Sequence, residues 1–353
     1  MAGERQLTVL VLGVGGHVSQ GIVKALRHGT LPVRIVGACV SPLSTGLYLC
    51  DSAHVSPYAD DAGFLDWVGA LCERERVDAV LSGVEPVLDA LAPYAGELRE
   101  RTGAVLVVSP PEALSVGRDK LITARWLEER GLPHAPSAEA ADAVGLPELV
   151  KLVGFPLVAK PRAGKGSAGV TVLRDQAALD RVSGRVGTVV QQLLGDEDGE
   201  FTAGCFVDRD GAVRGTIVMR RTLNAGTTVS ARIEDRPDVA EVAASVCSEL
   251  RPLGPCNVQL RLHDGAPVPF ELNVRFSGTT PIRVHFGFDE VGAALRHLVL
   301  GQPAEDLPRV TSGAALRYWN EIYPDDAAVA ALERDGSLDP GGFDRPAVED
   351  WGL

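Results

Sequence analysis

The sequence has few lysines, no closely spaced cysteine pairs and no long apolar run. No apolar stretch approaches the ~20 residues that a membrane-spanning helix needs, so we expect no membrane association. Six cysteines are scattered without C-x-x-C spacing, which disfavours a zinc site and predicts reduced, mostly buried thiols. Arginine supplies nearly all of the positive charge, because only five of 34 basic residues are lysine. These five are Lys24, Lys120, Lys151, Lys160 and Lys165.

Composition and charge are those of an acidic globular protein. The chain of 353 residues is 45% hydrophobic and 23% charged, with a net charge of −13. An acidic surface disfavours nucleic acid and anionic membranes as main partners. The polar N-terminal segment MAGERQ leads directly into a strand-like run, so we expect no signal peptide and a cytoplasmic location.

The first third of the chain alternates apolar strands with amphipathic helices, which predicts an open, doubly wound α/β domain over residues 1–115. The segment GVGGHVSQG after the first strand has Val18 where a dinucleotide fingerprint has its third glycine. Ser41 stands where a ribose-binding acid is expected, so nicotinamide binding is disfavoured. Two interpretations stay open for these glycines: a tight strand-to-helix turn, or a helix N-terminus that receives an anionic group.

The remaining chain divides into three parts. Residues 116–187 predict a linker helix and a small α+β unit, and residues 188–325 predict a strand-rich α+β unit. The Asp/Pro/Gly-rich residues 326–353 are expected to form a loosely ordered tail.

A glycine-rich loop follows Lys160 in FPLVAKPRAGKGSAGVTVL (residues 155–173). Glycines allow backbone N–H groups to approach phosphates, and lysines such as Lys160 and Lys165 neutralise them. The loop leads into a strand and lacks G-x-x-x-x-G-K-[ST], so it is not a P-loop. It predicts either a mobile lid over phosphates or a flexible surface hairpin.

The strand TVVQQLL (residues 188–194) and the polar loop after it suggest a nucleotide-binding edge. Main-chain groups at Gln191, Gln192 and Leu193 can read adenine, and Glu200 on the next strand can accept ribose hydroxyls. A buried strand followed by a solvated acidic turn explains the same pattern.

The hairpin NVQLRLHDGAPVPFELNVRF carries polar residues at alternating positions of its second strand. A three-residue turn at residues 263–265 would place Gln259, Glu271 and Asn273 on one face. One carboxylate and two amide oxygens suit Mg²⁺, and Arg275 can hold an anion. A solvated face with a Glu271–Arg275 ion pair is the competing interpretation.

Taken together, these motifs resemble the ATP-grasp superfamily, most closely the branch of the carbamoyl phosphate synthetase large subunit and biotin carboxylase. The matching order is GRDK, PLVAKPRAGKGSAGV, VVQQLLG…GEF and NVQLRL…FELNVRFSG, over about residues 7–320. The resemblance implies a Rossmann-like pre-ATP-grasp domain followed by an ATP-grasp fold of two α+β subdomains.

The resemblance also implies cofactors and site residues. ATP would be bound with Mg²⁺, for which Mn²⁺ can substitute, and Lys120 and Lys160 would contact the phosphates. The implied lid residues are Gly164, Lys165, Gly166, Ser167 and Gly169. The implied adenine and ribose contacts are Gln191, Gln192, Leu193 and Glu200. The implied metal ligands are Gln259, Glu271 and Asn273, with Arg275 beside them as an acyl-phosphate or carboxylate contact.

Two departures separate the chain from the carbamoyl phosphate branch. Gly278 in NVRFSG replaces the arginine of that branch's NPRVSR, and its VHTGDS signature is absent. Only one grasp unit is present. We therefore expect a stand-alone carboxylate–amine ligase that forms an amide through an acyl phosphate and releases ADP and phosphate. Its expected partners are a small carboxylate and an amine, such as an amino acid or small peptide, and a homodimer is possible.

Other residues are candidates for substrate contacts. Arg283 is expected to bind a substrate carboxylate and His285 to accept the amine proton. Surface or packing roles compete for both. Arg220 and Arg221 precede a Gly-Thr-Thr loop and are candidates for phosphate or substrate contact, and Glu85 ends a parallel strand where ligands commonly bind.

Three alternative functions stay open: carboxylation or carbamoyl phosphate chemistry on bicarbonate, a non-catalytic ATP-binding sensor, and a nicotinamide oxidoreductase. Gly278 disfavours the first and the full set of candidate metal ligands disfavours the second.

Overall fold

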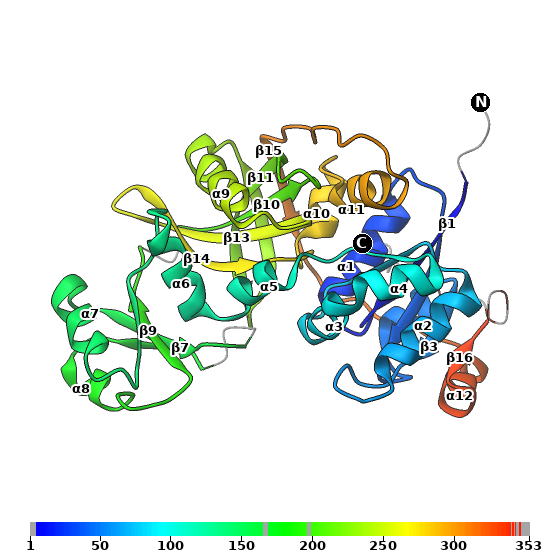
Figure 1. Cartoon of the computed structure of the whole chain (residues 1–353), viewed down its shortest axis with the longest axis horizontal. Helices are drawn as coiled ribbons and strands as arrows, with labels where there is room; N and C mark the ends of the chain where they lie inside the picture. The colour runs from blue at the N-terminus through cyan, green and yellow to red at the C-terminus, as the bar shows by residue number, and fades with distance from the viewer. Residues whose placement is uncertain are drawn as a thin grey trace.

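The computed structural model describes residues 5–164, 169–195 and 199–339, with residues 341, 343 and 346 (Figure 1). Its strands form two six-stranded sheets and one four-stranded sheet. The sheet of β1 and the sheet of β7 and β9 lie at opposite ends of the long axis, with β10, β13 and β14 between them (Figure 1). The predicted succession of an α/β unit and α+β units is confirmed.

The first sheet has the order β16-β3-β2-β1-β4-β5, and β1 to β5 are parallel. Strands β1 and β4 are buried almost throughout, which explains why they are continuous apolar runs in the sequence. The strands are β1 Leu7–Leu12, β2 Val33–Cys39, β3 Ser52–Val55, β4 Ala79–Ser82 and β5 Val105–Leu106. The helices are α1 His17–His28, α2 Phe64–Glu75, α3 Glu85–Leu91 and α4 Ala95–Thr102, with short 3₁₀ turns η1 Thr45–Leu49 and η2 Ala92–Tyr94.

The expectation of a loosely ordered tail is wrong for residues 326–338. Helix α12 (Asp326–Asp335) and strand β16 (Ser337–Leu338) return to the first domain, where β16 pairs antiparallel with β3. Leu332 and Leu338 are buried there, and Asp325 caps α12 by accepting a hydrogen bond from the N–H of Ala327. Burial of these apolar side chains orders the segment, although the residues around it are polar and rich in proline and glycine.

Two helices connect the first domain to the four-stranded sheet β6-β9-β7-β8. Asp119 of the GRDK motif caps α6 through the N–H groups of Leu121 and Ile122 and also binds Arg162 at 2.7 Å. Strand β9 pairs with β6 and β7, so it belongs to this sheet although the sequence suggests a break at residues 187–188. The elements are α5 Pro111–Arg118, α6 Lys120–Glu129, β6 Ser137–Glu139, α7 Gly145–Val153, β7 Leu157–Pro161, β8 Thr171–Leu173, α8 Gln176–Asp180 and β9 Thr188–Gln192.

The second six-stranded sheet has the order β14-β13-β10-β11-β12-β15 and is antiparallel. Helix α9 packs on it through Val239, Ala243 and Val246, which belong to the same apolar cluster as Phe201 and Val258. The strands are β10 Glu200–Val207, β11 Val213–Asn224, β12 Thr227–Glu234, β13 Gly254–His263, β14 Ala266–Asn273 and β15 Ser312–Leu316. The helices are α9 Pro237–Leu250, α10 Thr280–His285, α11 Glu290–Ala294 and the π-helical turn η4 Leu295–Val299.

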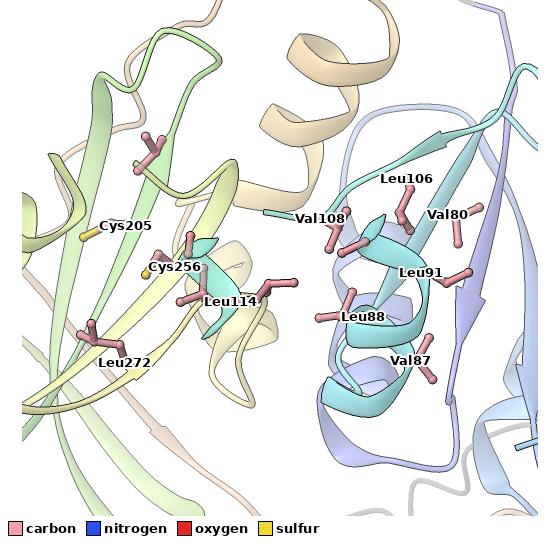
Figure 2. Close-up of a cluster of buried hydrophobic side chains, with 14 of the residues drawn as sticks. Val80, Val87, Leu88, Leu91, Leu106, Val108, Leu114, Cys205, Cys256 and Leu272 are labelled. Atoms are coloured by element: carbon pink, nitrogen blue, oxygen red, sulfur yellow. The ribbon is translucent and has the colours of Figure 1, made fainter. Parts of the chain in front are cut away.

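One apolar cluster joins the first domain to the second six-stranded sheet. In Figure 2, Val87 and Leu91 of α3 point into the first domain, whereas Leu88 points toward Leu114 of α5, which lies by Cys256. Gly117 allows the close approach of α5, because a Cβ there would lie 2.7 Å from Val274. The two units are therefore packed together, which fixes the cavity between them.

All six cysteines are buried and form no disulfide, as predicted. Among the described helices, none has the length and apolarity that a bilayer crossing requires.

Candidate active site

The β13–β14 hairpin is built differently from the sequence prediction but has the predicted face. Its turn has two residues, Asp264 and Gly265, with φ values of 51° and 79°, instead of three. A two-residue turn alone would place Glu271 on the wrong face. A bulge corrects this, because Leu260 pairs with Pro269 and Gln259 pairs with Glu271, leaving Phe270 as the extra residue.

The three predicted metal ligands lie together, because Gln259 and Asn273 both donate to the same carboxylate oxygen of Glu271. Gln259 Nε2 lies 3.2 Å and Asn273 Nδ2 lies 3.3 Å from Glu271 Oε1, and Arg221 donates to Gln259 Oε1 at 2.7 Å. Each amide group carries an oxygen beside its nitrogen, so a rotation of the Gln259 and Asn273 side-chain amides would present their oxygens to a cation instead. One carboxylate and two amides then fit Mg²⁺, which is held by few protein ligands and by phosphate oxygens. In the described part of the chain, no cluster of three His, Cys, Asp or Glu residues forms a richer metal site.

A cavity of about 440 Å³ lies between the four-stranded sheet and the second six-stranded sheet. It collects the predicted nucleotide residues from β7, the loop after β9, and the β13–β14 hairpin. Its lining includes Lys120, Lys160, Gly164, Gln191, Gln192, Leu193, Glu200, Gln259 and Glu271. Lys165, Gly166 and Ser167 lie outside the described residues, and Gly169 lies on the far side of that gap with a φ of 74°.

Lys160 is buried in this cavity, with 7% of its surface exposed. Its Nζ donates to Gln191 Oε1 at 2.7 Å and lies 5.3 Å from the ring centroid of Phe270. Desolvation lowers the pKa of Lys160 to about 8, against the attraction of Glu271, and nearby Lys120 and Arg261 lower it further. Lys120 Nζ donates to the carbonyl oxygen of Gly164 at 3.1 Å, so both lysines are held at the same side of the loop.

The segment expected to read adenine follows the paired part of β9. The paired strand ends at Gln192, and Leu193, Leu194 and Gly195 continue along the cavity. The Gln191 side chain accepts from Lys160 and donates to Ser137 at 2.8 Å, which the sequence does not reveal. Only glycine fits at position 195, because a Cβ there would lie 1.9 Å from the carbonyl oxygen of Leu262.

Glu200, the expected ribose contact, is bound by two arginines. Its Oε1 accepts from Arg221 at 2.9 Å and its Oε2 accepts from Arg261 at 2.8 Å. Glu200 lines the cavity, but a ribose hydroxyl would have to share its carboxylate with these two arginines. Arg261 was not singled out from the sequence, although its alternation with Gln259 along the strand was a usable signal.

A second cavity of about 530 Å³ lies between the first domain and the second six-stranded sheet. It shares Gly164, Gln259 and Glu271 with the nucleotide cavity, so the two cavities meet at the candidate metal ligands. Arg275 crosses it, donating to Glu85 Oε1 at 2.7 Å and to the carbonyl oxygen of Phe276 at 2.9 Å. Glu85 thus lines this cavity as the first residue of α3.

His17 explains the unusual glycine after Ser277. A Cβ at Gly278 would lie 2.9 Å from both Cδ2 and Nε2 of His17, so the imidazole occupies the space of a side chain there. His17, Ser277 and Thr279 all line the second cavity. No pattern in the sequence connects residue 17 with residue 278, so sequence reasoning missed His17.

Arg283 and His285 are not placed where the sequence suggested. Arg283 is fully buried and forms an ion pair with Glu290 at 2.9 Å, and it also donates to Asn257. Gly204 leaves room for its guanidinium, since a Cβ there would lie 2.2 Å from Arg283 Cζ. His285 is exposed on α10, with its ring 5.6 Å from that of His28. Neither residue lines the nucleotide cavity or the second cavity, so we assign neither to substrate.

Comparisons with known proteins find family matches to two parts of the chain. Residues 187–322 match the family "ATP-grasp in the biosynthetic pathway with Ter operon", and residues 9–106 match "PylC-like, N-terminal domain". The carbamoyl phosphate synthase large chain of Methanosarcina mazei is 25% identical over 305 residues, which are 77% of this chain and 28% of that protein. The formate-dependent phosphoribosylglycinamide formyltransferase of Burkholderia mallei is 29% identical over 174 residues, 49% of this chain and 40% of that protein. The chain therefore spans less than a third of the matching carbamoyl phosphate synthase large chain.

Solved structures share the fold across nearly the whole chain. N5-carboxyaminoimidazole synthetase from Staphylococcus aureus, complexed with ADP, superposes with a TM-score of 0.70 at 13% identity, covering 94% of this chain and 87% of that one. The biotin carboxylase domain of Hydrogenobacter thermophilus 2-oxoglutarate carboxylase, with MgADP and bicarbonate, gives 0.66 at 16% identity, covering 86% and 71%. By these matches, the chain contains an ATP-grasp domain over residues 187–322, preceded by a PylC-like N-terminal domain over residues 9–106.

Proposed function

We propose that the protein is an ATP-dependent carboxylate–amine ligase. It transfers the γ-phosphoryl group of ATP to a small carboxylate, and an amine then displaces phosphate to form an amide. ADP and phosphate are the other products.

The observation that carries this proposal is the junction of two cavities at Gln259 and Glu271. The first contains the two lysines and Gly164, which suit a nucleoside triphosphate. The second opens from the same carboxylate toward Arg275, Ser277 and His17, which suits a polar substrate. A phosphoryl group can therefore pass between bound ligands without leaving the protein, which is the positioning that such a transfer requires.

The chain's own residues supply the charge for this transfer. Lys120 and Lys160 hold the phosphates at the loop side, and Lys160 is buried enough for its charge to act in a low-dielectric site. Arg275 holds the substrate carboxylate from the other side, in exchange for part of its ion pair with Glu85. Gln259, Glu271 and Asn273 would hold Mg²⁺, which neutralises phosphate charge when bound.

A second candidate is carboxylation of an amine through carboxyphosphate. The biotin carboxylase domain in the comparison contains bicarbonate, and bicarbonate is itself a small carboxylate that the same phosphoryl transfer can activate. The departure at Gly278 distinguishes this chain from the carbamoyl phosphate branch, where the resemblance has an arginine. Amide formation is therefore the proposal that we favour.

The test is an ADP-release screen with Mg-ATP against paired carboxylates and amines, followed by mass measurement of the product. We expect release that requires both partners and a product lighter by one water than their sum. Release that needs only bicarbonate and an amine would replace this proposal with carboxylation. ATP binding without ADP release from any pair would favour a nucleotide-binding sensor.

Glu271→Ala provides the control for that screen. We expect it to abolish turnover while circular dichroism and thermal unfolding stay close to those of the unmodified protein, because Glu271 is only partly buried. Full activity in Glu271→Ala would remove the metal assignment.

A further inference from the structure

A second charged surface lies outside both cavities described above. Three neighbouring strands present two rows of side chains on one face: Arg220, Arg232 and Ala314 are paired in register, as are Thr222, Ser230 and Leu316. We call these six residues the arginine face. None of them lines the nucleotide cavity or the second cavity.

The charges of the arginine face are not balanced. Arg220 and Arg232 are directly opposed on an antiparallel pair, an arrangement of like charges that destabilises a sheet. Arg220 donates through Nε to Glu234 Oε1 at 2.7 Å, which leaves its two terminal nitrogens toward solvent. Within the ranges that the structure describes, the guanidinium group of Arg232 makes no ion pair and no hydrogen bond to another side chain, and the residue is exposed. In a protein with a net charge of −13, this face thus holds two directly opposed arginines, of which one is paired with a carboxylate.

The face is hollowed into a cavity of about 630 Å³. Arg221 and Arg261 also line it, and Glu200 is the carboxylate that they share. Ala314 leaves space beside Arg232, while Leu316 is 82% exposed and adds an apolar wall. The cavity therefore combines guanidinium groups, two hydroxyl donors and an apolar side.

We propose that the arginine face binds the phosphate group of a small molecule, at a site distinct from the ATP site. Two guanidinium groups and two hydroxyls provide the donors that a phosphate accepts, and bound phosphate removes the repulsion between Arg220 and Arg232. The cavity borders the nucleotide cavity through Glu200, Leu223 and Arg261, so an occupant here lies next to bound ATP. The ligand is either free phosphate or a phosphate ester whose remaining part contacts Leu316.

The experiment is calorimetric titration of inorganic phosphate, and separately of phenyl phosphate, into protein saturated with ADP at constant ionic strength. We expect one bound anion per chain. The Arg220→Ala/Arg232→Ala double variant should bind at least about tenfold more weakly, because both removed donors are charged. Arg334→Ala, which removes an exposed, ion-paired arginine on α12, is the matched control and should bind like the unmodified protein.

Comparison of the two probes identifies the source of the phosphate. Tighter binding of phenyl phosphate indicates an ester, and equal binding indicates the free anion. If the double variant fails to fold, Arg232→Gln alone retains the test, since Arg232 is exposed. Unchanged affinity in these variants, or no binding of either probe to the unmodified protein, would overturn the proposal. Turnover plays no part in this measurement, so its result is independent of the ligase proposal.

Discussion

Lys160 shows how much a single residue reveals in the sequence and how much it does not. Its position before a glycine-rich loop, in a chain with five lysines, is the signal from which the sequence predicts a phosphate contact. The sequence does not show that its ammonium is buried beside Phe270 and held by Gln191, because both contacts depend on tertiary packing. The same packing buries the ammonium, and this burial is the main cause of its lowered pKa.

The pKa of Lys160 leads to a pH prediction. Because burial holds this pKa at about 8, the ammonium loses its proton as the pH rises through that value, and the attraction for phosphate is lost. We expect the dissociation constant of ATP to rise above pH 8 and to be nearly constant from pH 6 to 7. Fluorescence titration at several pH values measures this directly.

Lys160→Arg is the control for that prediction, since a guanidinium does not titrate in this range. Its ATP affinity should show no inflection near pH 8. An inflection that persists in Lys160→Arg would assign the titration to another group.

Arg283 and His17 mark the limit of residue-level reasoning. Arg283 follows strand β14 and was expected to bind a substrate carboxylate, but it is buried together with its partner Glu290, and burial is not visible in a single sequence. His17 and Gly278 are adjacent only because α1 and the segment after β14 meet. Contacts between distant segments are what local patterns cannot predict.

At the scale of elements, the β13–β14 hairpin places Gln259 and Glu271 on the expected face, but its turn and strand pairing differ from the prediction. The expected odd-numbered turn is replaced by a two-residue turn with a bulge at Phe270, and each changes the parity once. The alternation of polar residues along β14 predicted the shared face, because alternate side chains of a strand point to the same side. The dipeptide Asp264-Gly265 is typical of a two-residue turn, but no pattern in the sequence predicts the bulge at Phe270 that keeps Glu271 on this face.

Gly265 provides a test of this turn. No atom lies within 4 Å of a Cβ placed there, so Gly265→Ala tests only the cost of a φ of 79°. We expect the free energy of unfolding to fall by about 1 kcal/mol, with an unchanged dissociation constant for ATP. Chemical denaturation checks the first value. A neutral or stabilising effect would contradict the left-handed conformation.

At the scale of the molecule, the C-terminal elements α12 and β16 pack against the N-terminal sheet. The sequence predicted the succession of sheets, because their apolar periodicities are strong, but it did not predict that α12 and β16 return to the first sheet. Strand β16 has only two residues, and a strand so short has no pattern of its own. Its place is determined by the exposed edge of β3 and the apolar face of α12.

Leu332→Ala tests this packing. Leu332 is 1% exposed, so its truncation should lower the free energy of unfolding by about 2–5 kcal/mol. Leu152→Ala, at a leucine that is 72% exposed, is the matched control and should have little effect. Equal stability of the two variants in urea denaturation would restore the expectation of a loose tail.

The central claim for the whole molecule is that Gln259, Glu271 and Asn273 hold a divalent ion where two cavities meet. The most direct measurement is Mn²⁺ binding by electron paramagnetic resonance in the presence of a non-hydrolysable ATP analogue. We expect Glu271→Gln to weaken Mn²⁺ binding at least about tenfold, since it removes the one carboxylate of the set. Mn²⁺ affinity in Glu271→Gln equal to that of the unmodified protein would contradict the account.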